Sequence, residues 1–292
     1  MINRVLFDLN LSKPAVSEAV HSCAQLCRER GIEVCLLADD AQAQALRSIV
    51  GDFRPLPSLQ KGDVDAIFVF GGDGTVLRAL SRFAQYDLPA LGVNLGRLGF
   101  LLETQTQEMA QALDMLIAGT YSIERRMMLH VEAQCGKACV STYAVNEVFI
   151  SRGMSQRMIA LDVLVGQTLV DHYIADGVVV ASPTGSTGYS LSAGGPIVSP
   201  DVDCFVLSPI CPHTLQSRPI VLSHKERITL RIDMIEEREG IQLSIDGQLV
   251  CRMRNREQVT VSRAEHDALL IRFPKERNFF SLLKDKLSQW SL

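Results

Sequence analysis

Residues 66–75 read Ala-Ile-Phe-Val-Phe-Gly-Gly-Asp-Gly-Thr, an unbroken apolar run that ends in a glycine-rich turn. Such a run predicts a buried strand, and a helix-period segment from Thr75 to Tyr86 follows it. Glycines let the main chain approach a ligand without Cβ obstruction, and the N–H groups at a helix start attract phosphate. The stretch therefore predicts a phosphate-binding turn; the alternative is an ordinary turn in which Asp73 caps the helix.

The flanking sequence repeats this alternation of strand and helix. It predicts that residues 1–103 form an α/β nucleotide- and phosphate-binding domain, a parallel sheet with helices on both faces. Ligands of such sheets bind beyond the carboxyl ends of the strands. The expected strands lie near 3–8, 33–38, 65–70 and 90–94, and a helix lies near 14–30.

The pattern changes after residue 125 to short β-rich runs, which predicts an all-β, mainly antiparallel second domain over residues 104–275. A helix-period segment at 105–119 would link the two domains. Residues 276–292 are amphipathic, and we expect this tail to pack back on the first domain. The β-rich runs are 129–134, 141–151, 159–165, 168–174, 177–182, 204–208, 219–223, 227–233, 241–246, 258–262 and 268–273.

Composition excludes several classes of protein. The 292 residues carry 29 basic and 33 acidic side chains, mixed along the chain, so no basic stripe is available for a nucleic acid backbone. No apolar run reaches the roughly 18 residues of a membrane span, and the first residues lead into a strand. We therefore expect a soluble, cytoplasmic protein. Its eight cysteines show no Cys-x-x-Cys spacing, which favours buried thiols.

The acid between the glycines is unusual for a pure phosphate site, because its charge would repel the ligand. This suggests that Asp73 accepts a proton from an attacking hydroxyl. No Gly-Lys-Ser/Thr follows, and Leu77 stands where a dinucleotide fingerprint has its third glycine. A second glycine cluster, Asn94-Leu95-Gly96-Arg97-Leu98-Gly99-Phe100, follows the next strand and predicts another loop at the same edge.

Three segments of the β-rich part stand out. Asp176–Pro196 passes from a valine-rich strand into a neutral loop rich in hydroxyls with one ring, which suits a nucleoside; a flexible loop is the alternative. Asn146 and Glu147 are adjacent, so they can meet one ligand only if their strand ends or bulges there. Structural and functional interpretations of that pair are equally open. Asp246-Gly247-Gln248 has the pattern of a hairpin turn.

Together these segments resemble the NAD kinase family, in order and at plausible spacing, over residues 65–275. The Gly-Gly-Asp-Gly motif alone is shared with diacylglycerol, sphingosine and sugar-phosphate kinases. The full set, above all Thr184–Pro196, is specific. The resemblance implies an enzyme that phosphorylates the 2′-hydroxyl of the adenosine ribose of NAD with ATP to give NADP.

The resemblance also implies the residue roles. Asp73 would be the catalytic proton acceptor. A divalent ion, Mg²⁺, would be carried with the nucleotide, so no residue is assigned as a metal ligand, and the enzyme would be a homodimer or homotetramer. The residues implied to bind NAD are Asp73, Gly74, Arg78, Asn146, Glu147, Arg157, Ile174, Asp176, Thr187, Gly188, Tyr189, Ser190, Leu191, Ser192 and Gln248.

The chain departs from the family pattern at two of these positions. Gly188 stands where the family usually has alanine, and Ile174 stands where some relatives carry a basic residue that contacts substrate. The apolar Ile174 side chain cannot select between NAD and NADH by charge.

Two other functions remain as alternatives. A lipid kinase with the same glycine motif needs an apolar entrance, and the loop 182–192 is polar. A non-catalytic dinucleotide sensor would gain nothing from a carboxylate that faces phosphate.

Overall fold

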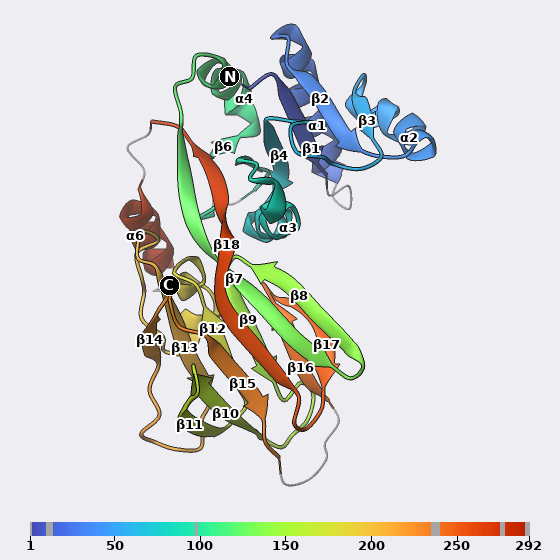
Figure 1. Ribbon diagram of the computed structural model, residues 1–292. Coiled ribbons are helices and arrows are strands. Elements are labelled where there is room, and N and C mark those ends of the chain that lie inside the picture. Colours follow the sequence, from blue (N-terminus) through green and yellow to red (C-terminus); the bar gives the residue numbers. More distant parts are fainter. Residues whose placement is uncertain (1, 10–13, 97–98, 235–239, 275–277, 290–292) are drawn as a thin grey trace. The chain divides into compact units, whose positions relative to one another are not determined.

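The chain forms two compact units, which the computed structural model in Figure 1 shows in ribbon form. Met1–Arg125 and Ala268–Leu292 make up the first unit, and Arg126–Asp267 make up the second. The structure describes residues 2–9, 14–96, 99–234, 240–274 and 278–289.

The border between the units lies after Arg125, whereas the sequence pattern predicted it after residue 103. The difference arises because helix α4 (Met109–Ile117) belongs to the first unit: its buried residues Met109 and Leu113 join the core of that unit. The tail also contributes to the first unit, where the Phe279 ring lies 5.8 Å from that of Phe100.

The first unit contains a parallel sheet, as predicted, in the order β5-β4-β1-β2-β3. The order reverses between β1 and β4, and ligands of such sheets bind beyond the carboxyl ends at this reversal. β1 ends at Asp8 and β4 ends at Gly71, so the glycine turn begins at the reversal. The strands are β1 (Arg4–Asp8), β2 (Glu33–Leu37), β3 (Arg54–Leu56), β4 (Ala66–Gly71), β5 (Ala90–Asn94) and a short β6 (Thr104–Gln105) that pairs with β5.

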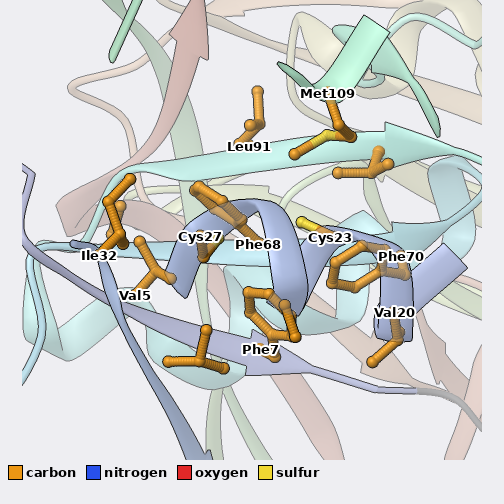
Figure 2. Close-up of a cluster of buried hydrophobic side chains, with 14 of the residues drawn as sticks. Val5, Phe7, Val20, Cys23, Cys27, Ile32, Phe68, Phe70, Leu91 and Met109 are labelled. Atoms are coloured by element: carbon orange, nitrogen blue, oxygen red, sulfur yellow. The ribbon is translucent and has the colours of Figure 1, made fainter. Parts of the chain in front are cut away.

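Helices cover both faces of this sheet. On one face, Cys23 and Cys27 of α1 and Met109 of α4 pack with Phe68 and Phe70 of β4 in a single apolar cluster (Figure 2). The helices of the unit are α1 (Pro14–Glu29), α2 (Asp40–Val50), α3 (Asp73–Phe83), α4 and α6 (Phe279–Gln289), with short 3-10 turns at Ala84–Tyr86 and Thr106–Glu108.

Helix α3 covers the opposite face. Gly92 alternates along β5 with Leu91 and Val93, which belong to the cluster of Figure 2. A Cβ at Gly92 would lie 3.2 Å from Val76 Cγ2 of α3, so this helix packs on the other side of the strand.

The second unit is built from antiparallel strands in two sheets. One has the order β14-β13-β12-β9-β16-β17, and the other contains β11-β10-β15-β18 together with the β7-β8 pair. Their inward residues form one apolar cluster, which makes a sandwich core. The strands are β7 (Ser122–Cys135), β8 (Ala138–Ala144), β9 (Glu147–Ser151), β10 (Ile159–Val165), β11 (Thr168–Ala175), β12 (Gly177–Ala181), β13 (Cys204–Ile210), β14 (Ile220–Ser223), β15 (Ile228–Ile232), β16 (Ile241–Ile245), β17 (Gln248–Met253) and β18 (Gln258–Arg272).

The structure differs from the sequence prediction at several elements. The run 141–151 is two strands, β8 and β9, and the runs 258–262 and 268–273 are one strand, β18. Helix α2 and strands β3 and β17 were not predicted. The start of α2 carried a readable signal, because Asp39 and Gln42 form a capping box.

The cysteines divide into three groups. Cys135 of β7 and Cys251 of β17 form a disulfide, so the prediction of buried thiols is wrong for this pair. It is also wrong for Cys139 and Cys211, which are exposed: Cys139 lies on β8, which pairs with β7 alone, and Cys211 follows the end of β13. It is confirmed for Cys23, Cys27, Cys35 and Cys204.

Within the described ranges, none of the helices combines the length and apolar character that crossing a membrane requires.

Phe68→Ala tests the core of the first unit. Phe68 is fully buried in the cluster of Figure 2, so we expect the substitution to lower the free energy of unfolding by about 3–5 kcal/mol in a urea titration. The matched control is Phe280→Ala, because that ring is 65% exposed and its loss should cost no more than about 0.5 kcal/mol. Equal effects of the two substitutions would contradict this packing.

Candidate functional site

The turn after β4 places an uncapped helix start at the edge of the sheet. Gly72 is the N-cap of α3, and it offers no side chain to the free N–H groups of the first turn. A Cβ at Gly71 would lie 2.5 Å from Thr75 Oγ1, so only glycine lets the chain turn this tightly. Gly74 is exposed and has open space around it. These features suit the approach of a phosphate group.

The Asp73 side chain does not cap α3, so the alternative of a simple helix cap is wrong. Its carboxylate instead accepts the N–H groups of Phe100 (2.9 Å to Oδ2) and Leu101 (3.1 Å to Oδ1). A Cβ at Gly99 would overlap this carboxylate, which explains the glycine at that position. The two glycine motifs therefore meet at Asp73. Each carboxylate oxygen keeps a further lone pair for another partner.

The second glycine motif is shaped by its own asparagine. Asn94 lies beside Gly71 in the sheet, and its side chain both donates to the Gly96 carbonyl (2.8 Å) and accepts the Gly96 N–H (2.9 Å). Arg97 and Leu98 of this motif lie outside the described residues.

Two arginines of α3 face the end of β1. Arg82 lies 3.4 Å from the Asp8 carboxylate, and Arg78 also acts on this carboxylate through its charge. Burial raises the pKa of Asp8, and the two arginines oppose that shift. Arg78 is exposed on the first turns of α3, where its cation is available to an anionic ligand.

In the second unit, the chain leaves the extended strand conformation just before Glu147. β8 stops at Ala144 and β9 begins at Glu147. A Cβ placed on Gly188 would lie 3.2 Å from Glu147 Oε2 and 3.7 Å from Asn146 Nδ2. Both side chains therefore reach the same glycine of the loop 182–192, and an alanine there would crowd Glu147 Oε2 but make only ordinary contact with Asn146 Nδ2.

Burial makes Glu147 an unusual acid. Its side chain is 8% exposed, and Oε2 has no hydrogen-bond partner among the described residues. Desolvation, followed by repulsion from Asp246, raises the pKa of Glu147 to about 7. At neutral pH this carboxyl group therefore carries its proton for a large part of the time.

Three serine hydroxyls of the loop 182–192 hold the loop in place by hydrogen bonds within it or to neighbouring strands and turns. Ser182 donates to the Val145 carbonyl (2.5 Å), Ser186 donates to the Pro183 carbonyl (2.6 Å), and the buried Ser190 contacts Ser208 (3.0 Å). The alternative of a flexible loop is thereby disfavoured: the segment forms a 3-10 turn, Thr184–Thr187, and a short helix, Tyr189–Ser192.

Tyr189 and Ser192 of this loop are exposed. Tyr189 is 41% exposed and packs edge-on against Phe149, with ring centroids 4.9 Å apart. Burial of its hydroxyl, together with the nearby Cys211 and Asp176, raises the pKa of Tyr189. Ser192 is exposed, and Thr187 is half-buried and donates to the Thr184 carbonyl (3.3 Å).

Asp176 lies between β11 and β12. Its carboxylate accepts the Arg152 Nε–H at 2.6 Å, and its carbonyl accepts the Arg152 N–H at 3.0 Å. The other predicted positions of this unit lie at its surface or partly so: Arg157, Ile174 and Gln248 are exposed, and Leu191 is half-buried.

Four supporting residues were not assigned a role from the sequence: Ser182, Arg152, Phe149 and Asp246. No spacing rule joins Arg152 to Asp176 or Phe149 to Tyr189, because each pair comes together only through sheet pairing. Asp246 looked like a turn residue, and it is one, but its carboxylate also accepts the N–H groups of Val145, Asn146 and Glu147.

One group of side chains has the composition of a metal site. Among the described residues, only Asp162, His172 and Asp233 bring three potential ligand atoms within 4.8 Å of one another. However, Arg231 lies 2.6 Å and His172 Nδ1 2.7 Å from the Asp162 carboxylate. The Arg231 hydrogen bond is the main reason that the pKa of Asp162 is lowered. This carboxylate is already neutralised, so the group is a poor fit for a cation.

Comparison with known proteins identifies a family for both parts of the chain. Residues 42–121 match the model of the ATP-NAD kinase N-terminal domain, and residues 145–273 match that of the ATP-NAD kinase C-terminal domain. An NAD kinase of Desulforamulus reducens is 41% identical over 290 residues, which is 99% of this chain and 98% of that protein. The chain belongs to the NAD kinase family.

Other members of the family agree. An NAD kinase of Moorella thermoacetica is 37% identical over 291 residues, 99% of this chain and 90% of its own length. Among solved structures, a yeast NADH kinase in complex with NADH has a TM-score of 0.85 and 26% identity, covering 98% of this chain and 88% of that one. An NAD kinase from Archaeoglobus fulgidus in complex with ATP has a TM-score of 0.68 and 25% identity, covering 96% of each chain. The resemblance stated from motifs is thus confirmed, and the lipid kinase and sensor alternatives are not favoured.

The pKa of Glu147 yields a prediction for stability. The folded protein holds this proton more tightly than the unfolded chain, so its stabilising contribution is complete below pH 4.5 and is lost as the pH rises through about 7. Glu147→Gln cannot ionise. The free energy of unfolding of the Glu147→Gln variant, minus that of wild type, should therefore rise by up to about 3 kcal/mol from acidic to mildly alkaline pH.

Urea titrations across this pH range measure that difference. Glu265→Gln, which removes an exposed carboxylate from β18, is the control and should not reproduce the rise. If wild type and Glu147→Gln differed in free energy of unfolding by the same amount at all pH values, the buried, protonated state of Glu147 would be disproved.

Proposed function

We propose that this member of the NAD kinase family transfers the terminal phosphoryl group of ATP to the 2′-hydroxyl of the adenosine ribose of NAD, with Asp73 as the base. The observation that carries this proposal is the position of Asp73. Its carboxylate is held at the carboxyl edge of the parallel sheet by two main-chain N–H groups and lies beside an uncapped helix start. A proton acceptor and a phosphate-binding element thus share one turn.

The chemistry requires little more than placement and charge. The 2′-oxygen attacks the terminal phosphorus, the bond from that phosphorus to the bridging oxygen breaks, and Asp73 takes the hydroxyl proton through a free lone pair. The first N–H groups of α3 and the Arg78 cation stabilise negative charge on the phosphates. Because the two N–H donors fix the carboxylate, little reorganisation is needed when the hydroxyl arrives.

NAD is proposed to bind through the second unit as well. Asn146 and Glu147 offer an amide and a carboxyl group to ribose hydroxyls, and Tyr189 offers a ring face to a base. Asp176, Thr187 and Ser192 add polar groups, while the buried Ser190 supports the loop from within. Gly74, Arg157, Ile174, Gly188, Leu191 and Gln248 complete the proposed set.

Mg²⁺ is proposed to enter with the nucleotide, where it would neutralise charge on the triphosphate. This agrees with the side chains near Asp73, because both oxygens of that carboxylate hold main-chain N–H groups. A homodimer or homotetramer and a cytoplasmic location stay predictions. The exposed apolar side chains of β11, among them Leu169, Val170 and Ile174, support the first of these.

The first test is the reaction itself. Purified protein incubated with ATP, Mg²⁺ and NAD should form NADP, which an NADP-dependent dehydrogenase detects. Reactions without ATP or without NAD are the controls. Absence of NADP with every nucleoside triphosphate and with polyphosphate would refute the proposed activity.

Asp73→Asn tests the base. The amide keeps the size of the side chain but cannot take the proton, so we expect kcat to fall at least about 100-fold while NAD still binds. The matched control is Asp285→Asn on α6, an exposed position at which the same change should leave kcat unaltered. A kcat close to wild type for Asp73→Asn would remove this residue from the base role.

A further inference from the structure

The chain between β8 and β9, Val145–Glu147, is called the 145–147 corner here, and two residues from other segments hold all of its backbone polar groups. The Asp246 carboxylate accepts the N–H groups of Val145 (2.8 Å), Asn146 (2.7 Å) and Glu147 (3.1 Å). The three carbonyls accept from Ser182 Oγ (2.5 Å), Ser182 N (2.8 Å) and Asp246 N (3.0 Å), in chain order.

This arrangement explains why the strand breaks. Successive N–H groups of a β-strand point to opposite sides, so three in a row can meet one carboxylate only where the chain is not extended. Converging N–H groups form a concave site that attracts anions. In the 145–147 corner the anion is supplied by the protein itself, as the side chain of Asp246.

The hairpin turn presents that carboxylate. Asp246 and Gly247 both have positive φ angles, 47° and 74°, and they connect Ile245 to its partner Gln248. Two such residues make the tight turn that aspartate and glycine favour. The turn motif seen in the sequence is therefore a hairpin whose first residue reaches across to another strand.

The side chains of the corner take no part in holding its backbone, which other segments hold. Asn146 Nδ2 and Glu147 Oε2 both lie near Gly188, and Oε2 is buried without a hydrogen-bond partner among the described residues. A buried polar oxygen in this state is costly unless another molecule supplies the missing hydrogen bond. The corner therefore offers an unfilled polar position next to the hydroxyl-rich loop.

We propose that Asp246 is a positioning residue of the NAD site, which holds the 145–147 corner in the shape that directs Asn146 and Glu147 toward the substrate. Asp246 acts through these two residues and does not itself contact NAD. The proposal rests on the proposed function for the identity of the ligand, whereas the support of the corner is a property of the free protein.

The charge of Asp246 has a second effect. Glu147 is packed against β12, β16 and the loop around Gly188, and the charged group that acts on it from these elements is Asp246. The pKa of Asp246 is raised by burial, and the three N–H donors oppose this shift. Its negative charge helps Glu147 to keep a proton. A protonated carboxyl group can both donate and accept, as a ribose hydroxyl does.

Two substitutions of Asp246 distinguish the effect of its negative charge from the effect of the position of its oxygens. Asp246→Asn removes the charge and one acceptor oxygen, while Asp246→Glu keeps the charge but displaces the oxygens by one methylene. We expect both to weaken equilibrium binding of NAD by at least about tenfold, through KM more than kcat. Asp201→Asn, at an exposed turn of the same unit, is the control and should bind NAD as wild type does.

The pH dependence gives a readout that needs neither catalysis nor NAD. The effect of Glu147→Gln on unfolding is measured in the wild-type, Asp246→Asn and Asp246→Glu backgrounds. The pH at which this stability difference is half developed should be lower in the Asp246→Asn background. In the Asp246→Glu background it should stay near the wild-type value.

Failure of this proposal is distinguishable from failure of the proposed function. Absence of NADP formation by wild-type protein would refute the activity and leave the pH readout intact. If Asp246→Asn bound NAD like wild type, or left the Glu147 midpoint unchanged, the positioning role of Asp246 would be overturned.

Discussion

The contact between the Asp246 carboxylate and three consecutive N–H groups determines the local shape of the second unit. Without an acceptor at that place, three N–H groups at a buried strand break would lose water and gain nothing, at a cost of about 1–3 kcal/mol each. With the Asp246 carboxylate as acceptor, β8 can end and β9 can begin. The adjacent side chains of Asn146 and Glu147 can then both reach Gly188.

In the first unit, too, a carboxylate accepts backbone N–H groups of another segment. The Asp73 carboxylate accepts two N–H groups of the second glycine motif, so a charged side chain again holds a loop by its backbone. Hydrogen bonds to a charged acceptor are about twice as strong as those between neutral groups. They also leave lone pairs on the acid, and the proposed role of Asp73 as a base would use one of these.

The two acids differ in what surrounds them. Asp73 lies at the reversal of strand order in a parallel sheet, where helix α3 begins and where Arg78 and Arg82 add positive charge. Asp246 lies in a β-sandwich beside a second buried acid, Glu147, whose proton it helps to retain. The first environment suits phosphate and the second suits neutral hydroxyls. This division matches a reaction that joins a phosphoryl group to a sugar hydroxyl.

The sequence by itself determined the alternation of strands and helices in the first unit, apart from α2 and β3, the β-rich character of the second, and the motifs of the NAD kinase family. These features follow from local periodicity and from residues that are close in the chain. It did not reveal that Asp73 holds Phe100 and Leu101, that Ser182 and Asp246 clamp the 145–147 corner, or that Cys135 joins Cys251. Those contacts join residues far apart in the chain. Only sheet pairing decides which of many possible partners a side chain meets, and burial then decides whether it carries a proton.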